Sequence, residues 1–205
     1  MSLSKHELFQ QMLEQINLHH QPEYLPYFEN GEIEQVIVHK KSKLWSFQFV
    51  FDNVLPFEVF TALMNHMKIK FQSIATIDFQ IKTRKPILTN ESILDYWETV
   101  VQRSNISSPL VLSLFAKHTP VVLDNKVVIS VENEITKNHL ADNYLSIIQQ
   151  NYLVLGFPSF QITIEVDEAA SEARMAQYLA RKQEQDEMLV KQAEEAIKQN
   201  QQDRQ

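Results

Sequence analysis

The alternation of apolar and polar residues is most regular between residues 44 and 51. Trp45, Phe47, Phe49 and Phe51 recur at every second position, which places four aromatic rings on one face of a strand. Pro56 then stands at the start of a segment whose apolar residues follow helical spacing, namely Phe57, Phe60, Leu63, Met64, Met67, Phe71 and Ile74. We therefore predict a helix that packs on the aromatic face of the strand.

The residues on either side complete a first structural unit. Ser4 and Glu7 have the spacing of a capping box, and they begin a helix with an apolar stripe at Leu8, Met12, Leu13 and Ile16. Strands are predicted over 33–39 and 76–82, and the KKSK turn joins the first of them to the aromatic strand. The predicted order is helix, hairpin, helix, strand.

A second unit repeats this order. Asn90 is the expected cap of a helix with apolar positions at Ile93, Leu94, Trp97, Val100 and Val101, and Pro109 begins a shorter helix with Leu110, Leu112, Leu114 and Phe115. A hairpin over 121–131 turns at residues 124–126, a long helix ends at Gly156, and a strand over 160–166 closes the unit. We expect both Trp45 and Trp97 to lie in the core.

These patterns predict an α+β fold made of two small two-layer sandwiches with repeated β-β-α-β order, followed by a charged helical linker. The expected boundaries are 1–85 for the first unit, 86–167 for the second and 168–205 for the linker. The last segment is rich in Ala, Glu, Gln, Lys and Arg. Its thin apolar stripe, Met175, Leu179, Met188, Leu189, Ala193, Ala196 and Ile197, favours a solvated helix over one that docks on a partner or pairs with itself.

Composition excludes several kinds of chemistry. The chain has no cysteine, so it can form neither disulfides nor Cys-based metal sites, and its two glycines are too few for a Walker loop or a GxGxxG turn. The seven histidines show no HExxH or HxH spacing, and the adjacent His19 and His20 are more typical of exposed residues than of metal ligands. We predict no catalytic residue, no metal site and no cofactor. No apolar run is long enough for a signal peptide or a membrane span, which favours a cytoplasmic protein.

The net charge of −7 disfavours sequence-independent binding to nucleic acid. Two basic clusters in the first unit are local exceptions, and we name them as candidate DNA-binding residues: Lys40, Lys41 and Lys43 in the hairpin turn, and Lys82, Arg84 and Lys85 after a strand. Solvated lysines that blunt a sheet edge and a protein-interaction edge are the other interpretations. Residues 86–167 hold four basic and nine acidic side chains, so the second unit is a poor surface for DNA.

Three segments carry a family resemblance: FENGEIEQVIVHKKSKLWSFQF, YWETVVQRSNISSPL and HLADNYLSIIQQNYLVLGFPSFQI. With the spacing around them, from about Leu8 onward, they resemble the N-terminal region of the PolC-type DNA polymerase III alpha subunit, the replicative polymerase of low-GC Gram-positive bacteria. The first unit is also similar to the alpha-binding domain of the clamp-loader tau subunit. The second has a possible KH-like topology, but it lacks the GxxG loop that clamps RNA.

The resemblance implies a non-catalytic part of a DNA-directed DNA polymerase, a nucleotidyltransferase with 3′–5′ exonuclease activity whose divalent metal would be held elsewhere. Two roles stay open. The region is either a module that tethers the polymerase to replisome proteins, such as the clamp-loader tau subunit or the helicase, or an accessory module that binds the DNA backbone. No contact with a membrane is expected.

Overall fold

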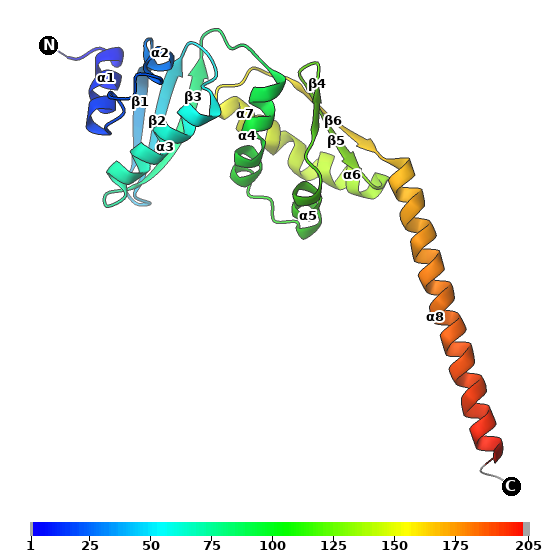
Figure 1. Ribbon diagram of the computed structural model, residues 1–205. Helices are drawn as coiled ribbons and strands as arrows, with labels where there is room; N and C mark the ends of the chain where they lie inside the picture. Colours follow the sequence, from blue (N-terminus) through cyan, green and yellow to red (C-terminus); the bar gives the residue numbers. More distant parts are fainter. Residues whose placement is uncertain (1, 203–205) are drawn as a thin grey trace.

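The protein consists of two three-stranded sheets with helices packed against them and a long C-terminal helix that extends away from the body (Figure 1). This architecture comes from a computed structural model that describes residues 2–202, with side chains except those of residues 170, 171, 174 and 194–202. The first part contains α1 (Lys5–Gln15), α2 (Leu25–Phe28), β1 (Glu32–His39), β2 (Leu44–Phe51), α3 (Phe57–Phe71) and β3 (Thr76–Thr83).

The second part contains α4 (Asn90–Arg103), α5 (Pro109–Lys117), β4 (Val121–Leu123), β5 (Lys126–Val131), α6 (Glu134–Leu140), a π-helical turn η1 (Ala141–Leu145), α7 (Ser146–Val154) and β6 (Gln161–Val166). The chain then continues as α8 (Glu168–Gln202). None of the helices, over the residues that the structure describes, is long and apolar enough to span a membrane.

Both sheets have the same topology. In sheet A, formed by β1, β2 and β3, the middle strand β2 is antiparallel to β1 and parallel to β3. In sheet B, formed by β4, β5 and β6, the middle strand β5 is antiparallel to β4 and parallel to β6. Each parallel pair is joined by a helical crossover, because a parallel connection cannot be made by a tight turn. The predicted α+β class and the repeated β-β-α-β order are confirmed.

The aromatic strand forms the centre of the first core. Phe47, Phe49 and Phe51 are at most 5% exposed, and Phe49 stacks on Phe79 of β3 at a centroid distance of 6.1 Å. Helix α1 covers this face through Phe9, whose ring meets those of Phe49 and Phe51 edge-on. Helix α3 covers the other end of the same face through Phe71, which contacts Trp45 and Phe47. Among the residues that the structure describes, no helix packs on the opposite face of sheet A (Figure 1).

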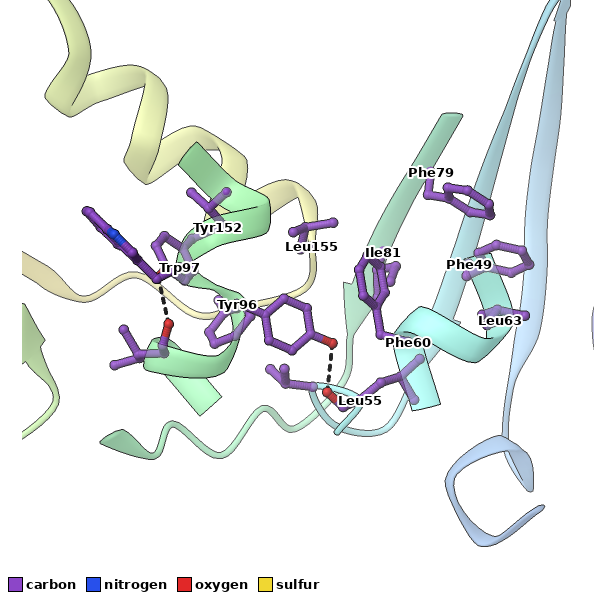
Figure 2. Close-up of a cluster of buried hydrophobic side chains, with 14 of the residues drawn as sticks. Phe49, Leu55, Phe60, Leu63, Phe79, Ile81, Tyr96, Trp97, Tyr152 and Leu155 are labelled. Carbon is purple, nitrogen blue, oxygen red and sulfur yellow. Dashed lines mark hydrogen bonds between the residues drawn. The ribbon is translucent and has the colours of Figure 1, made fainter. Parts of the chain in front are cut away.

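The two sheets share one continuous hydrophobic core. Figure 2 shows Tyr96 of α4 pointing into the first unit, where its hydroxyl donates a 2.8 Å hydrogen bond to the carbonyl oxygen of Leu55. On the other side of this junction, Ile81 of β3 forms a parallel bridge with Leu155, and the Thr83 hydroxyl donates to the carbonyl oxygen of Gly156 at 2.6 Å. The segment after α7 therefore extends the edge of sheet A.

Two buried tyrosines hold α4 in place at this junction. The Tyr152 hydroxyl donates to the carbonyl oxygen of Ile93 at 2.7 Å, and both Tyr96 and Tyr152 are almost fully buried. Burial raises the pKa of both phenols above the ordinary tyrosine value, so they stay protonated and act as donors. Since a buried carbonyl without a donor is costly, these two bonds hold α4 against its neighbours.

Several predicted details differ from the structure. Thr89, which forms a capping box with Ser92, caps α4 in place of Asn90, whose side chain instead accepts a bond from the backbone N–H of Asn125. Helix α3 ends at Phe71, so Ile74 lies beyond it and is exposed. The predicted long helix before Gly156 is divided into α6, η1 and α7.

Some residues assigned to buried stripes are exposed. Leu8, Leu94, Leu110 and Leu112 are 38–54% exposed, and Trp45 is only partly buried, whereas Trp97 is buried as predicted. The cap at Ser4 and Glu7, by contrast, forms as predicted.

The tail is helical, as predicted, and α8 would be about 50 Å long at 1.5 Å per residue. Met175, Leu179, Met188 and Leu189 are all more than 50% exposed on it. Ala196 and Ile197 of the predicted stripe lie outside the described side chains.

Candidate functional site

The two basic clusters lie at opposite ends of sheet A. Lys40, Lys41 and Lys43 occupy the turn between β1 and β2, where β3 also begins, since the backbone N–H of Thr76 donates to the carbonyl oxygen of Lys43. Lys82, Arg84 and Lys85 lie at the far end of β3. The eight residues of β2 separate these ends by about 25 Å. The structure therefore brings each cluster together but does not combine them in one patch.

The second cluster is largely engaged in ion pairs. Lys82 lies 2.7 Å from a Glu34 carboxylate oxygen, and Arg84 contacts Glu32 at 3.1 Å and Asp52 at 3.0 Å. Hydrogen bonding to Lys82 lowers the pKa of Glu34, and hydrogen bonds from Asn30 and Arg84 lower that of Asp52. These carboxylates offset the positive charge that would face a phosphate group.

The first cluster is different, because Lys40, Lys41 and Lys43 are exposed and, in the part of the chain that the structure describes, no ion pair holds them. Lys43 has a positive φ of 50°, in the left-handed region, as tight turns require at some positions. These three ammonium groups are free to meet an anionic partner.

The uncovered face of sheet A carries a ladder of amides. Gln35 donates to Gln48 at 2.6 Å, and Gln48 donates to Gln80 at 3.0 Å, so one glutamine from each strand joins the row. The aromatic side chains of β2 point to the other face. Binding of single strands by base stacking requires exposed rings, and this face offers none along the register of β2.

The rings of His19 and His20 lie in contact, tilted by 43° with their centroids 3.6 Å apart, and the buried Nδ1 of His19 has no hydrogen-bond partner. A metal site needs more than two imidazoles. Within residues 2–202, no group of three or more His, Asp or Glu side chains could hold a metal ion.

The second unit carries an apolar depression between α4 and α5, which we call the α4–α5 groove. It has a volume of about 450 Å³. Trp97 and Phe115 meet edge-on at its floor, with ring centroids 5.2 Å apart. Exposed Leu94 and Leu112 form parts of its walls. The complete lining is Leu94, Trp97, Glu98, Val101, Gln102, Leu112, Phe115, Ala116 and Thr119.

A second depression of about 250 Å³ shares Trp97, Phe115 and Thr119 with the groove. It extends the apolar surface toward Val121 of β4 and toward Asp167 at the base of α8. The two depressions present indole, phenyl and aliphatic surface to solvent. Such a surface can bind apolar side chains of another molecule. The ionisable side chains that line the two depressions are Glu98 in the first and His118 and Asp167 in the second.

The charged side chains at the groove are mainly acidic. Glu98 lies on its wall and accepts a 3.4 Å hydrogen bond from Gln102, and Glu91 lies on the same face of α4 two turns earlier. On the opposite wall, which α5 forms, the basic residue of the helix is Lys117 in its last turn.

Sequence reasoning missed this groove, although a signal was present. Helix α5 has only nine residues, and its apolar positions, Leu110, Val111, Leu112, Leu114, Phe115 and Ala116, surround it on all sides. A two-layer unit can bury only one side of such a helix. Val111 and Leu114 are buried, and Leu110 and Leu112 are left exposed.

Comparisons with known proteins match both units. Residues 8–81 match the family described as DNA polymerase III polC-type N-terminus I, and residues 95–205 match DNA polymerase III polC-type N-terminus II. The search of solved structures found no significant match.

The curated relatives similar to this chain include proteins named DNA polymerase III PolC-type. The relative from Latilactobacillus sakei is 44% identical over 84% of this chain and 12% of its own length. That from Pediococcus pentosaceus is 35% identical over 97% of this chain and 14% of its own length, and that from Bacillus subtilis is 31% identical over 77% and 11%. The chain thus spans about one eighth of the length of these relatives.

Proposed function

Because this chain belongs to the PolC-type DNA polymerase III N-terminal family, we propose that it is a non-catalytic protein-interaction module of a replicative DNA polymerase. The parent protein would be a cytoplasmic DNA-directed DNA polymerase with 3′–5′ exonuclease activity. Its divalent metal ions and catalytic carboxylates would lie in other domains.

The observation that carries this proposal is the α4–α5 groove. Apolar surface that faces solvent is costly, so a concave patch with two aromatic rings at its floor favours a binding role over a structural one. The shared core supports the proposal further, because a partner bound at α4 would be held rigidly with respect to sheet A. Replisome proteins such as the clamp-loader tau subunit and the helicase are the proposed partners.

Site-directed crosslinking in the whole polymerase tests this role. A photo-reactive amino acid at Leu112 should form covalent adducts with the purified clamp loader or helicase under ultraviolet light. The matched control is the same amino acid at Ile135, which is 81% exposed on α6 outside the groove. Equal adduct formation from both positions, or none from Leu112, would contradict the groove as the interaction site.

An accessory role in binding the DNA backbone is the second candidate, and the exposed lysines at the β1–β2 turn favour it. Fluorescence anisotropy of a labelled primer-template and of a single strand, at about 50 and 200 mM salt, would measure it, because phosphate contacts release counterions and weaken steeply as salt increases. Alanine at Lys40, Lys41 and Lys43 should abolish such binding. Alanine at Lys68 and Lys70, which are exposed on α3, is the control that should leave it intact.

A further inference from the structure

The interaction role proposed above leaves the chemistry of the partner open, and the following inference rests on that role. We propose that the α4–α5 groove binds an amphipathic helix of a partner protein, with an apolar stripe flanked by Lys or Arg. This assigns both a shape and a charge to the occupant.

The dimensions of the groove favour a helix. Its α4 wall runs from Leu94 to Gln102, nine residues that span about 12 Å along the helix axis. That length corresponds to roughly two helical turns of an occupant, whose side chains at i, i+3, i+4 and i+7 would lie over the floor. Trp97 and Phe115 supply the flat apolar surface that such side chains fill.

An extended peptide fits less well. Strand addition needs a long free edge, because backbone hydrogen bonds supply most of its affinity. The strand nearest the groove is β4, which has three residues and pairs with β5 along its whole length. Apart from Thr119, the residues that line the groove lie on α4 and α5, where the backbone groups of the helix interior are already paired.

The charge of the groove favours a basic partner. Glu98 faces it directly, and Glu91 lies two turns earlier on α4, beyond the groove lining, where it borders a depression beside residues 53–57. The second unit as a whole has a charge of −5, with four basic and nine acidic side chains over residues 86–167. Lys or Arg residues on the flanks of an occupant would be attracted to this rim, whereas Glu or Asp residues would be repelled.

A competing occupant is helix α8 of a second copy. Met175, Tyr178 and Leu179 form a short exposed stripe on α8, followed by Arg181 and Lys182. Because α8 extends away from the body as one continuous helix, it carries this stripe away from the groove of its own chain (Figure 1). The experiment below separates this alternative by measuring oligomeric state.

The test uses two synthetic helical peptides of about 18 residues with the same Leu and Phe stripe, one flanked by Lys and Arg and the other by Glu. Anisotropy against the 205-residue chain should show the basic peptide binding at least tenfold more tightly than the acidic one. Leu112→Asp should abolish binding, and Glu91→Lys with Glu98→Lys should reverse the preference between the peptides. Glu14→Lys, a charge reversal of the same kind at one exposed position on α1, is the control and should change neither affinity.

Each other outcome overturns the inference. Equal affinity for the two peptides would refute the basic charge assigned to the partner helix. No binding of either peptide would refute the helical shape of the partner. In both cases the interaction role would stand if Leu112 still forms crosslinks. A dimer in light scattering that Leu112→Asp dissociates would assign the groove to α8 of a second copy. Loss of both peptide binding and crosslinking would refute the interaction role itself.

Discussion

The two units have the same strand order but treat their surfaces differently. In the first unit, polar side chains on the uncovered side of sheet A bond to one another, through the glutamine row and through the ion pairs of Lys82 and Arg84. In the second unit, the space between α4 and α5 leaves Leu94 and Leu112 open to solvent beside the buried Trp97. On these two faces, a repeated topology thus produces one surface whose polar groups bond to one another and one surface that is apolar.

This difference indicates where interactions are to be sought. Surface polar groups that bond to one another gain little from a new partner, since each existing bond must be exchanged. Exposed apolar area has no such competing partner, and its burial is worth roughly 25 cal/mol per Å². The second unit is therefore the better candidate for protein binding, although its acidic charge makes it the poorer one for DNA.

The largest expected effect tests whether the units are energetically separate. Phe49→Ala removes a fully buried ring from sheet A and should lower the free energy of unfolding by about 3–5 kcal/mol. Because the core is continuous, urea unfolding followed by fluorescence in variants that retain only Trp45 or only Trp97 should show the same decrease at both probes. An unchanged midpoint at Trp97 would mean that the units unfold independently. Ile135→Ala, at an exposed position, should change stability by less than about 0.5 kcal/mol.

Gly156→Ala sharpens the comparison at the junction. Gly156 has a φ of +93°, which residues with a side chain rarely adopt, and an added Cβ would lie 2.9 Å from Cγ2 of Ile81 and 3.0 Å from Cγ2 of Thr83. Strain and overpacking should together cost about 1–3 kcal/mol, measured by urea unfolding. Ser159→Ala, an exposed change in the same loop, should be nearly neutral. A neutral Gly156→Ala would show that the contact with β3 is not tight in solution.

Tyr96→Phe removes only the hydroxyl that joins α4 to the first unit. The carbonyl oxygen of Leu55 would lose its donor in a buried setting, so the variant should be destabilised by about 1–3 kcal/mol in thermal or urea unfolding. Tyr27→Phe, at a half-exposed position, should have no measurable effect. Equal stability of both variants would indicate that water satisfies the carbonyl of Leu55.

The smallest effect concerns the ion pairs on the uncovered side of sheet A. The pKa values of Glu34 and Asp52 are lowered in the folded protein. These carboxylates therefore contribute to folding stability above the ordinary carboxylate pKa of about 4, and this contribution is lost as pH decreases through the lowered pKa values. Stability should therefore fall below about pH 4, and Glu34→Gln with Asp52→Asn should flatten part of that decline in acid titrations followed by circular dichroism. An identical acid profile in both proteins would show that these pairs add nothing.

Periodicity alone predicted most of the elements. The aromatic alternation of β2, the helix after Pro56, the capping box at Ser4 and the turn at Asp124 and Asn125 all form, because each depends on residues within a few positions of one another. Errors arose where local signals compete. Asn90 and Thr89 are both good helix caps by residue type. The Asn90 side chain instead accepts a hydrogen bond from the backbone N–H of Asn125 in the β4–β5 turn, and Thr89 caps the helix.

The sequence by itself determined the fold class, the two repeated units, the helical tail and the absence of cysteine chemistry, since composition and short-range spacing are properties of the chain. Only the tertiary structure decided that the units share a core, that the basic clusters lie at opposite ends of sheet A, and that α4 and α5 leave a groove. These features join residues far apart in sequence, as Leu55 and Tyr96 or Ile81 and Leu155 do. Their pairing depends on the packing of whole elements, which no local pattern encodes.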